Sequence, residues 1–288
     1  MAKSPYSIED VYKEINTIDE YFYEMRKGLG SVEYANQFIT KYCPKMNGSG
    51  YGNCRNYLQK ANSGIINLLE NLKKYNLEYD KLAEYAILFL SYKLNKHSEH
   101  KLTNLNDFYT KNIEKNEYYN NMKIKDNGPT YKDIINTKKD LMNTKEIYKF
   151  DYPFSILVSL YNEIKKKDMD CTKYSEKANY FAKNFEKLNN DSNINGNASY
   201  SKLLFTLSDD YNNLKNIYDS NNSCNFPPLP KVKTPPSKLI PALSTFSVIP
   251  VFLGISYKYS LFGVDKLFQR QYLRKKLKKV KKKMKLNI

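Results

Sequence analysis

The uncharged run from Leu239 to Tyr257 most constrains what this chain can fold into. It holds 19 residues without a formal charge and is flanked by Lys238 and Lys258. A helix of that length spans about 28 Å, close to the roughly 30 Å hydrocarbon thickness of a bilayer. Pro250 predicts a kink, because membrane helices tolerate proline where other groups satisfy the freed backbone. We expect one transmembrane helix over residues 239–257; the alternative is a buried helix or hairpin within a core.

The segments on either side of this run fit a membrane anchor. Residues 226–238 hold five prolines in 13 positions, a composition that favours an extended, semi-rigid spacer and therefore predicts a stalk. Residues 258–288 carry 12 Lys or Arg against one acid. The positive-inside rule then places this tail in the cytosol.

The tail can lie as a basic amphipathic helix along an anionic inner leaflet, because its apolar residues repeat at helical spacing. The apolar stripe consists of Leu273, Leu277, Val280 and Met284. The basic residues expected at the membrane surface are Arg270, Arg274, Lys275, Lys276, Lys278, Lys279, Lys281, Lys282 and Lys283. Binding of nucleic acid or calmodulin by the same residues is the alternative, and it requires a tail that is free of the membrane.

The strong basicity belongs to the tail rather than to the rest of the chain. The whole sequence holds 47 basic and 30 acidic residues, whereas residues 1–257 hold 35 and 29. A surface so nearly balanced lacks the electrostatic footprint of a nucleic-acid binder, so we expect no nucleic-acid partner.

The N-terminus lacks the apolar h-region of a cleavable signal peptide. If the tail is cytosolic, the N-terminal domain has to cross a membrane without a signal peptide. The competing topology keeps the N-terminal domain in the cytosol.

Residues 1–225 predict an all-α domain. Apolar residues recur at spacings of three and four, which places them on one face of a helix. The stripes are Ile8, Val11, Ile15, Ile18, Phe22 and Met25; Leu58, Ala61, Ile65, Leu68 and Leu72; Leu82, Tyr85, Ala86, Phe89 and Leu90; Tyr174, Ala178, Phe181, Phe185 and Leu188; and Leu203, Leu207, Tyr211, Leu214 and Tyr218. Convincing period-two alternation is absent. Ser7, and Thr130 with Asp133 three residues on, predict helix starts.

Four cysteines indicate an oxidising compartment. Cys43 and Cys54 bracket a Gly-rich loop, and Cys224 lies at the foot of the expected stalk. An even number of cysteines in this arrangement suits disulfides, and we expect Cys43–Cys54 and Cys171–Cys224 among three possible connectivities. Four free thiols in a cytosolic domain are one alternative. A zinc site is the other, although no Cys-x-x-Cys pair and no usefully spaced His accompanies them.

The sequence contains no recognisable catalytic set. The two histidines, His97 and His100, lie in a polar stretch without a His-Glu-x-x-His frame, and we expect both to be solvated. The glycines of residues 48–52 follow no strand and lack the Gly-Lys-Ser/Thr ending of a phosphate loop. We therefore expect no enzyme, no cofactor and no metal site.

The juxtamembrane segment "SLFGVDKLFQRQYLRKKLKKVKKKM" follows "FLGISYKY". It is similar to the C-terminal signature of the Plasmodium interspersed repeat (PIR) family, variant antigens of malaria parasites. Upstream, "YCP…C", "ANSGIINLLENL", "LAEYAILFLSYKLN", "CTKYSEKANYFAKNFEKLNND" and "YSKLLFTLSDDYNNLKNIYD" resemble its blocks in order and spacing. The resemblance covers essentially the whole chain, and the rodent-parasite branch is the most similar.

The resemblance implies a helical variable domain, one membrane pass, routing without an ordinary signal peptide, and export to the infected red cell membrane or the parasitophorous vacuole membrane. It implies roles in antigenic variation and host interaction, with a host receptor or an antibody as partner. Ile65 and Tyr174 stand where many members have Cys, and Phe89 where Trp is frequent, so some disulfides of other members cannot form here. A membrane-anchored organiser of the vacuole or the red-cell cytoskeleton is the second hypothesis.

Overall fold

The computed structural model of the protein describes residues 7–45, 52–164, 170–222 and 224–234. The chain divides into two units, Met1–Pro235 and Pro236–Ile288, and all described residues belong to the first. The expected transmembrane helix at 239–257 and the basic tail at 258–288 lie outside the described residues. Within the described ranges, no helix combines the length and the apolar character needed to cross a bilayer.

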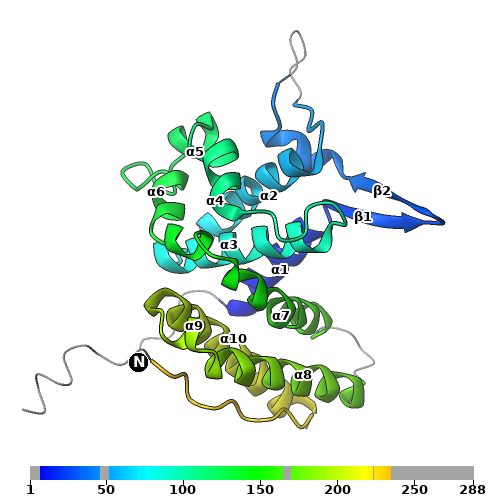
Figure 1. The fold of residues 1–288 in the computed structure, drawn as a ribbon. Helices are drawn as coiled ribbons and strands as arrows, with labels where there is room; N and C mark the ends of the chain where they lie inside the picture. The colour runs from blue at the N-terminus through cyan, green and yellow to red at the C-terminus, as the bar shows by residue number, and fades with distance from the viewer. Residues whose placement is uncertain (1–6, 46–51, 165–169, 223, 235–288) are drawn as a thin grey trace, which may run out of the picture. The chain divides into compact units, whose positions relative to one another are not determined.

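The described part of the chain is built from helices and one β-hairpin (Figure 1). In chain order the elements are α1 (Ile8–Asp19), β1 (Phe22–Lys27), β2 (Gly30–Ala35), η1 (Gln37–Tyr42), α2 (Tyr57–Leu72), η2 (Lys73–Tyr75), α3 (Tyr79–Lys96), α4 (Leu105–Phe108), η3 (Tyr109–Ile113), α5 (Glu117–Asn121), α6 (Tyr131–Asn136), η4 (Lys139–Met142), η5 (Lys145–Phe150), α7 (Asp151–Glu163), α8 (Cys171–Asn190), α9 (Ser192–Asn195) and α10 (Ala198–Asn222). Two expected helix starts are confirmed. The Ser7 side chain caps α1, and Thr130 forms a reciprocal capping box with Asp133 at α6.

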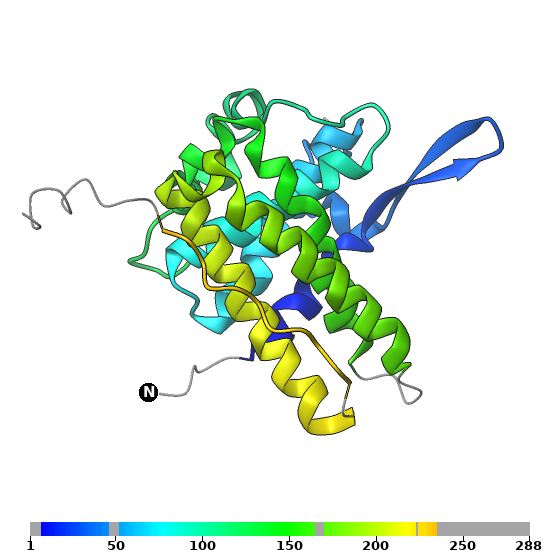
Figure 2. The same ribbon diagram turned by 60° about the horizontal axis from the view of Figure 1, so that its bottom comes forward.

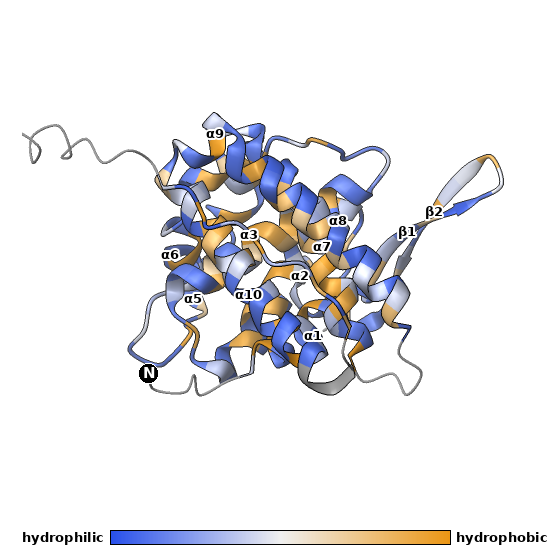
Figure 3. Ribbon diagram, turned by 90° about the horizontal axis from the view of Figure 1, so that it is seen from below, coloured by the Kyte–Doolittle hydropathy of each residue, from blue (hydrophilic) through white to orange (hydrophobic). Residues whose placement is uncertain are grey.

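Helix α3 forms the centre of the domain. Every residue from Leu82 to Leu94 is buried, because α2, α6 and α7 pack around it. Below this group α8, α9 and α10 form a second group, with α7 between the two (Figure 1). Apolar residues gather where the helices face one another (Figure 3), as an all-round buried helix requires.

The polar residues of α3 are buried with partners. Glu84 accepts hydrogen bonds of 2.6 Å from Lys138 Nζ and 2.7 Å from the Thr206 hydroxyl. The Ser91 hydroxyl donates a 2.6 Å bond to Asp151. Each bond removes most of the cost of burying its polar groups. These contacts connect the central helix to the segment between α6 and η4, to α7 and to α10.

A cluster of tyrosines surrounds the carboxylate of Asp210 on α10. The hydroxyls of Tyr12 on α1 and Tyr85 on α3 donate to it at 2.8 Å and 3.0 Å, and the Tyr161 hydroxyl donates to the Asp210 backbone carbonyl at 2.6 Å. Tyr12 stacks on Tyr161 with ring centroids 4.3 Å apart. The chain has 27 Tyr and no Trp, and here buried tyrosines supply both aromatic bulk and hydrogen-bond donors.

The first part of the expected stalk packs against the domain. Cys224 and Phe226 are buried, and Leu229 and Val232 lie against the core. Tyr211 donates to the Pro227 carbonyl at 2.8 Å, and the Asn189 side chain bonds both the Lys231 carbonyl and the Lys233 amide. Residues 224–234, here called the strap, therefore pack against the helical domain.

The strap runs alongside α8 and α10 from the start of α8 to its end, as the orange segment of Figure 2 shows. Its length fits that course. The nine steps from Cys224 to Lys233 cover about 28 Å in polyproline geometry, and the 18 steps of α8 from Cys171 to Asn189 cover about 27 Å. A run of prolines gives an extended segment whose carbonyls are free to accept hydrogen bonds from the helices.

Candidate interaction surface: the β-hairpin

A two-stranded hairpin, β1–β2, projects from the helical domain (Figure 1). The apolar stripe expected to continue through Phe22 and Met25 as helix instead breaks at Asp19, and the chain turns into an antiparallel pair. The prediction of an all-α domain is therefore corrected to a mostly helical one. The two strands hold aromatic and β-branched residues among charged ones, and with only six residues each they give a weak period-two signal.

The turn of the hairpin has a clear local cause. Lys27 pairs with Gly30, which leaves Gly28 and Leu29 as a two-residue loop. Gly28 has a φ of 59°, a conformation that glycine adopts without strain. Glycine at the first central position is the mark of a type II′ hairpin turn, whose twist matches that of the strands.

The two faces of the hairpin differ in character. Side chains directly opposite each other lie on the same face, and faces alternate along a strand. Tyr23–Tyr34 and Met25–Val32 therefore share one face, and Glu24 lies opposite Glu33 on the other. We call the first the outward face and the second the inward face.

The inward face is attached to the helical domain. Ser98 donates to Glu24 through its backbone amide at 2.7 Å and through its hydroxyl, and Lys60 forms an ion pair with Glu33. His97 Nε2 lies 3.3 Å from a Glu33 carboxylate oxygen. Two glutamates directly opposite each other repel, so these partners stabilise a pairing that would otherwise be unfavourable. Hydrogen bonds from Ser31 and Ser98 lower the pKa of Glu24 to about 2.

The outward face is largely apolar; it is half-buried at Tyr23 and Met25 of β1 and exposed along β2. The Tyr23 and Tyr34 rings stack with centroids 4.8 Å apart, and the exposed fractions of Val32 and Tyr34 are 47% and 39%. Leu29, at the tip, is fully exposed. None of these side chains packs against the core of the described domain. A folded domain gains no stability by placing an apolar face outward and a charged face inward, so the outward face is a candidate contact surface.

The root of the hairpin is rigidly held. Lys93, buried in α3, donates to the Phe22 carbonyl, to the Asp19 carbonyl at 2.9 Å and to the Asp19 carboxylate at 2.6 Å. Burial lowers the pKa of this lysine to about 8. Phe22 is itself buried against Gly64 of α2, where an added Cβ would lie 2.8 Å from the ring.

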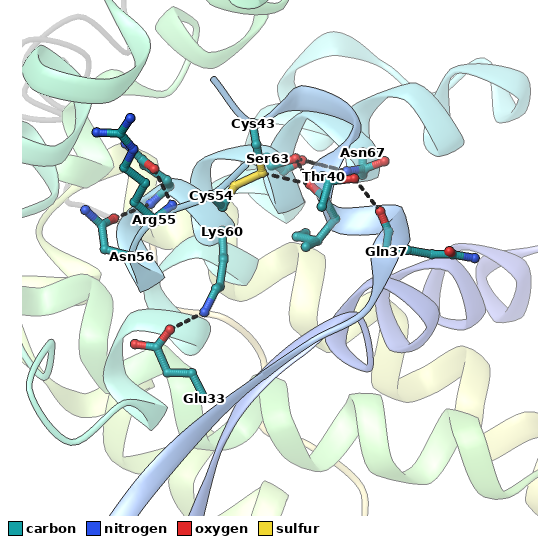
Figure 4. Close-up of a disulfide and its surroundings, with 12 residues drawn as sticks. Glu33, Gln37, Thr40, Cys43, Cys54, Arg55, Asn56, Lys60, Ser63 and Asn67 are labelled. Atoms are coloured by element: carbon teal, nitrogen blue, oxygen red, sulfur yellow. Dashed lines mark hydrogen bonds and ion pairs between the residues drawn. A yellow bond between two sulfur atoms is a disulfide. The ribbon is translucent and has the colours of Figure 1, made fainter. Parts of the chain in front are cut away.

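The Cys43–Cys54 disulfide braces the elements behind the hairpin (Figure 4). It joins the end of η1 to the residues that precede α2, with Cα atoms 5.0 Å apart. The Ser63 hydroxyl donates to the Ile39 carbonyl of η1, and Figure 4 shows the Lys60–Glu33 ion pair on the same side of α2. The disulfide thus stabilises the helix on which the inward face of the hairpin rests.

Comparison with known proteins identifies the family. Residues 12–258 match the family described as Plasmodium variant antigen protein Cir/Yir/Bir. The chain belongs to this Cir/Yir/Bir family. A solved structure, "Structure of a Plasmodium PIR protein ectodomain", shares 32% sequence identity with it at a TM-score of 0.60, over 79% of this chain and 99% of that one. Among curated proteins, none matches the sequence.

The second disulfide of this Cir/Yir/Bir chain secures the strap. Cys171, at the first residue of α8, is bonded to Cys224 at the start of the strap, with Cα atoms 5.1 Å apart. Both bonds correspond to the pairing expected from the sequence. The nine basic tail residues from Arg270 to Lys283 that were expected at a membrane surface lie outside the described residues.

The histidines of this Cir/Yir/Bir domain are not both solvated, which corrects the prediction. His97 is 3% exposed and its ring lies 4.2 Å from that of Tyr57 and 4.6 Å from that of His100. His100 is half-buried, and burial lowers its pKa. The cause is local: the polar stretch that follows α3 folds back beneath the hairpin, where Glu33 needs a partner. No pattern in the sequence predicted the contact between His97 and Glu33.

The buried acids of the domain are enclosed by the protein. Burial raises the pKa of Asp210 to about 7 and that of Asp151 to about 8, but both lie in the core between helices. Raised carboxyl pKa values are typical of general acids in open clefts; here the groups are out of reach of a substrate. Within the described residues no group of His, Cys, Asp and Glu is arranged to hold a metal ion.

Proposed function

We propose that this chain is a non-enzymatic, single-pass membrane variant antigen whose hairpin contacts a host receptor or an antibody. The outward face of the hairpin is the observation that carries the proposal. It offers two stacked tyrosines, Val32 and the fully exposed Leu29, and aromatic side chains are the commonest anchors of protein interfaces. The family is one of variant antigens, which supports this reading over catalysis.

The partner that this surface fits is a protein with a shallow apolar depression. The projecting tip can enter a recess that a flat helical surface cannot. The attached root keeps the hairpin in one orientation, which lowers the entropy cost of binding. Arg26 and Lys27 beside the tip would meet acidic groups at the rim of such a recess.

The membrane arrangement is part of the same proposal. Residues 239–257 span the bilayer, and the tail from 258 onward lies in the cytosol on anionic inner-leaflet lipids. In the described domain the strap ends on the side opposite the hairpin (Figures 1 and 2). Assignment to the rodent-parasite branch stays a prediction from the sequence blocks.

Accessibility on intact infected red cells tests the location. A tag beside Ser4 should be reached by antibody and protease without permeabilisation. A tag reached only after selective red-cell lysis would contradict surface display. It would favour the vacuole membrane or an internal organising role.

Binding to host cells tests the surface itself. The double variant Leu29→Ser with Val32→Ser should lose at least tenfold in affinity for the host cells that bind the full-length chain, without loss of folding stability. Phe205→Ser, on α10 and 43% exposed, removes a comparable apolar group elsewhere and should leave binding unchanged. Equal binding by all three chains would reject the hairpin as the contact surface.

A further inference from the structure

The free edge of strand β2 carries backbone groups without a partner. The Asn36 amide donates to the Tyr21 carbonyl at 2.7 Å, which makes these two residues a hydrogen-bonded pair at the root of the hairpin. Bonded and non-bonded pairs alternate along antiparallel strands, so the N–H and C=O groups of Ser31 and Glu33 point away from β1. Within the described ranges of the chain, no backbone group bonds to either residue from that side.

The two edges of the hairpin differ in exposure. All six residues of β2 are exposed, whereas the first four residues of β1 are buried or half-buried. At the root of β1 the Phe22 carbonyl already accepts a hydrogen bond from Lys93, and the Glu24 carboxylate accepts one from the Ser98 amide. The edge of β2 is therefore the one that another strand can reach.

The edge of β2 lacks the features that usually protect an exposed strand. Natural proteins block free edges with lysine, proline, a bulge or a covering segment. Residues 30–35 contain neither lysine nor proline, and the strand pairs with β1 without a bulge. Its one charged residue, Glu33, lies on the inward face, where Lys60 forms an ion pair with it. An edge of this kind is suited to accept an extended strand from another chain.

The sequence of β2 complements itself when two copies pair antiparallel about a two-fold axis. With Val32 opposite Val32 of the second copy, Ser31 lies opposite Glu33 and Gly30 lies opposite Tyr34. The unpaired backbone groups of Ser31 and Glu33 then bond each other on both sides of the axis. Each Tyr34 ring lies beside a glycine, which has no side chain, and such aromatic–glycine pairs stabilise edge strands.

Charge and space favour this register over its neighbours. Arg26 lies opposite Ser31 on the inward face, so it brings a positive charge close to Glu33 of the second copy. A shift by two residues in one direction would set the two Glu33 side chains opposite each other, and opposed like charges are unfavourable. It would also bring Leu29, at the tip, level with Gln37, where β2 has ended and η1 begins. A shift in the other direction would halve the number of backbone bonds between the copies.

We propose that this chain forms a two-fold symmetric dimer through the β2 edges of two copies, which join their hairpins into a four-stranded antiparallel sheet. Such an isologous contact uses the same residues on both copies. A sheet of more than two strands is more stable than an isolated hairpin, and the small contact area makes the dimer reversible. Side chains stand perpendicular to the sheet, so pairing leaves the outward face open, and the dimer is independent of the host contact proposed above.

Cysteine cross-linking of the full-length chain in detergent micelles tests the register. The four cysteines of the chain form two disulfides, so an introduced cysteine is the only free thiol. Under copper–phenanthroline oxidation, Val32→Cys should give covalent dimer at least tenfold faster than Tyr34→Cys, because only residue 32 lies opposite its own copy. The two positions are similarly exposed, at 47% and 39%, so random collisions affect both alike. Equal rates, a faster Tyr34→Cys chain, or no dimer from either would overturn the proposal.

Analytical ultracentrifugation of the same micelles measures the association itself. Ser31→Pro removes an edge donor that β1 does not use, a position where a strand tolerates proline, and it should weaken the dimer at least tenfold. Ser31→Ala keeps the backbone donor and should weaken the dimer far less. Any association through residues 235–288 is common to all the chains, and circular dichroism checks the fold of each. A wild type that stays monomeric, or a folded Ser31→Pro chain that associates like the wild type, would refute the dimer.

Discussion

The hydroxyl of Tyr12 donates a 2.8 Å hydrogen bond to the carboxylate of Asp210, 198 residues further along the chain. This bond joins the first helix of the described domain to its last one and lies wholly within the core. Tyr85 donates to the same carboxylate from α3. The three helices are therefore connected through one buried acid, which makes this cluster the clearest place to test how the domain is held together.

Removal of one donor should cost a measurable part of the folding free energy. Tyr12→Phe leaves the ring in place and leaves Asp210 with one tyrosine donor fewer, so we expect a loss of about 1–3 kcal/mol. Urea unfolding followed by circular dichroism measures it. Tyr152→Phe, whose ring is 53% exposed, is the matched control and should change stability by less than about 0.5 kcal/mol. Equal effects of the two variants would contradict the prediction.

Stability should depend on pH through Asp210. Burial raises its pKa from 3.8 to about 7, although the charge of Lys81 and the tyrosine hydrogen bonds act in the opposite direction. A carboxyl whose pKa is raised by folding stabilises fully below its unfolded pKa, and that contribution is lost as pH rises through the folded one. The chain should therefore lose about 2 kcal/mol between pH 5 and pH 7.5 from this group.

Asp210→Asn tests the assignment of this pH dependence. The variant should lack the part of the pH dependence that Asp210 contributes. The quantity to measure is the difference in the free energy of unfolding between the wild type and the variant as a function of pH. The lowered pKa of His100 acts in the opposite direction over the same interval, but it is present in both chains and cancels. A wild type and variant with parallel pH profiles would show that Asp210 does not titrate in this window.

The two disulfides should differ in what they contribute. In the chain-entropy account, the Cys43–Cys54 bond closes a separation of 11 residues and contributes about 3 kcal/mol. The Cys171–Cys224 bond closes 53 residues and contributes about 4 kcal/mol. Replacing both cysteines of the Cys171–Cys224 bond with serine should therefore cost more stability than replacing both cysteines of the Cys43–Cys54 bond. Hydrogen exchange adds a local check, because only loss of the second bond should speed exchange at the Lys233 amide that Asn189 holds.

Gly64 should resist substitution although it lies within a helix. Alanine there would gain about 1 kcal/mol in helix propensity, but its Cβ would lie 2.8 Å from the ring of the buried Phe22. Overpacking of this kind costs about 1–3 kcal/mol, so Gly64→Ala should be destabilising on balance. Phe22→Leu makes room, and in that background Gly64→Ala should cost less. A double-mutant cycle from thermal unfolding measures the coupling, and a coupling energy near zero would disprove the contact.

The helices of the domain were largely visible in the sequence, and the hairpin was not. Apolar stripes such as the one from Leu82 to Leu90 predict helices, because residues that recur about every 3.6 positions lie on one face only when the chain is helical. Phe22 fell in phase with the stripe of α1 by coincidence: it is buried because Gly64 leaves space for it, not because the helix continues. Gly28 and Gly30 on either side of Leu29 were the available sign of the turn.

Two other features depend on contacts between distant segments. The sequence of the strap predicts an exposed proline-rich spacer. The structure shows that the strap packs on the helices through Tyr211 and Asn189. Asn62 of α2 and Lys115, which lies between η3 and α5, line one cavity of about 550 Å³, a proximity that no local pattern encodes. The family blocks predicted the general class of the protein, whereas the outward face of the hairpin required the register of two strands.

The two faces of the hairpin differ in what they contact, and they should therefore differ in how well they tolerate substitution. The inward face and the buried root carry the contacts with the helices, whereas Tyr23, Met25, Val32 and Tyr34 lie outside the core of the described domain. Substitutions at these four positions can therefore alter what the molecule recognises at little cost to folding. A lineage under immune selection can explore new surfaces here one residue at a time while the same scaffold continues to fold.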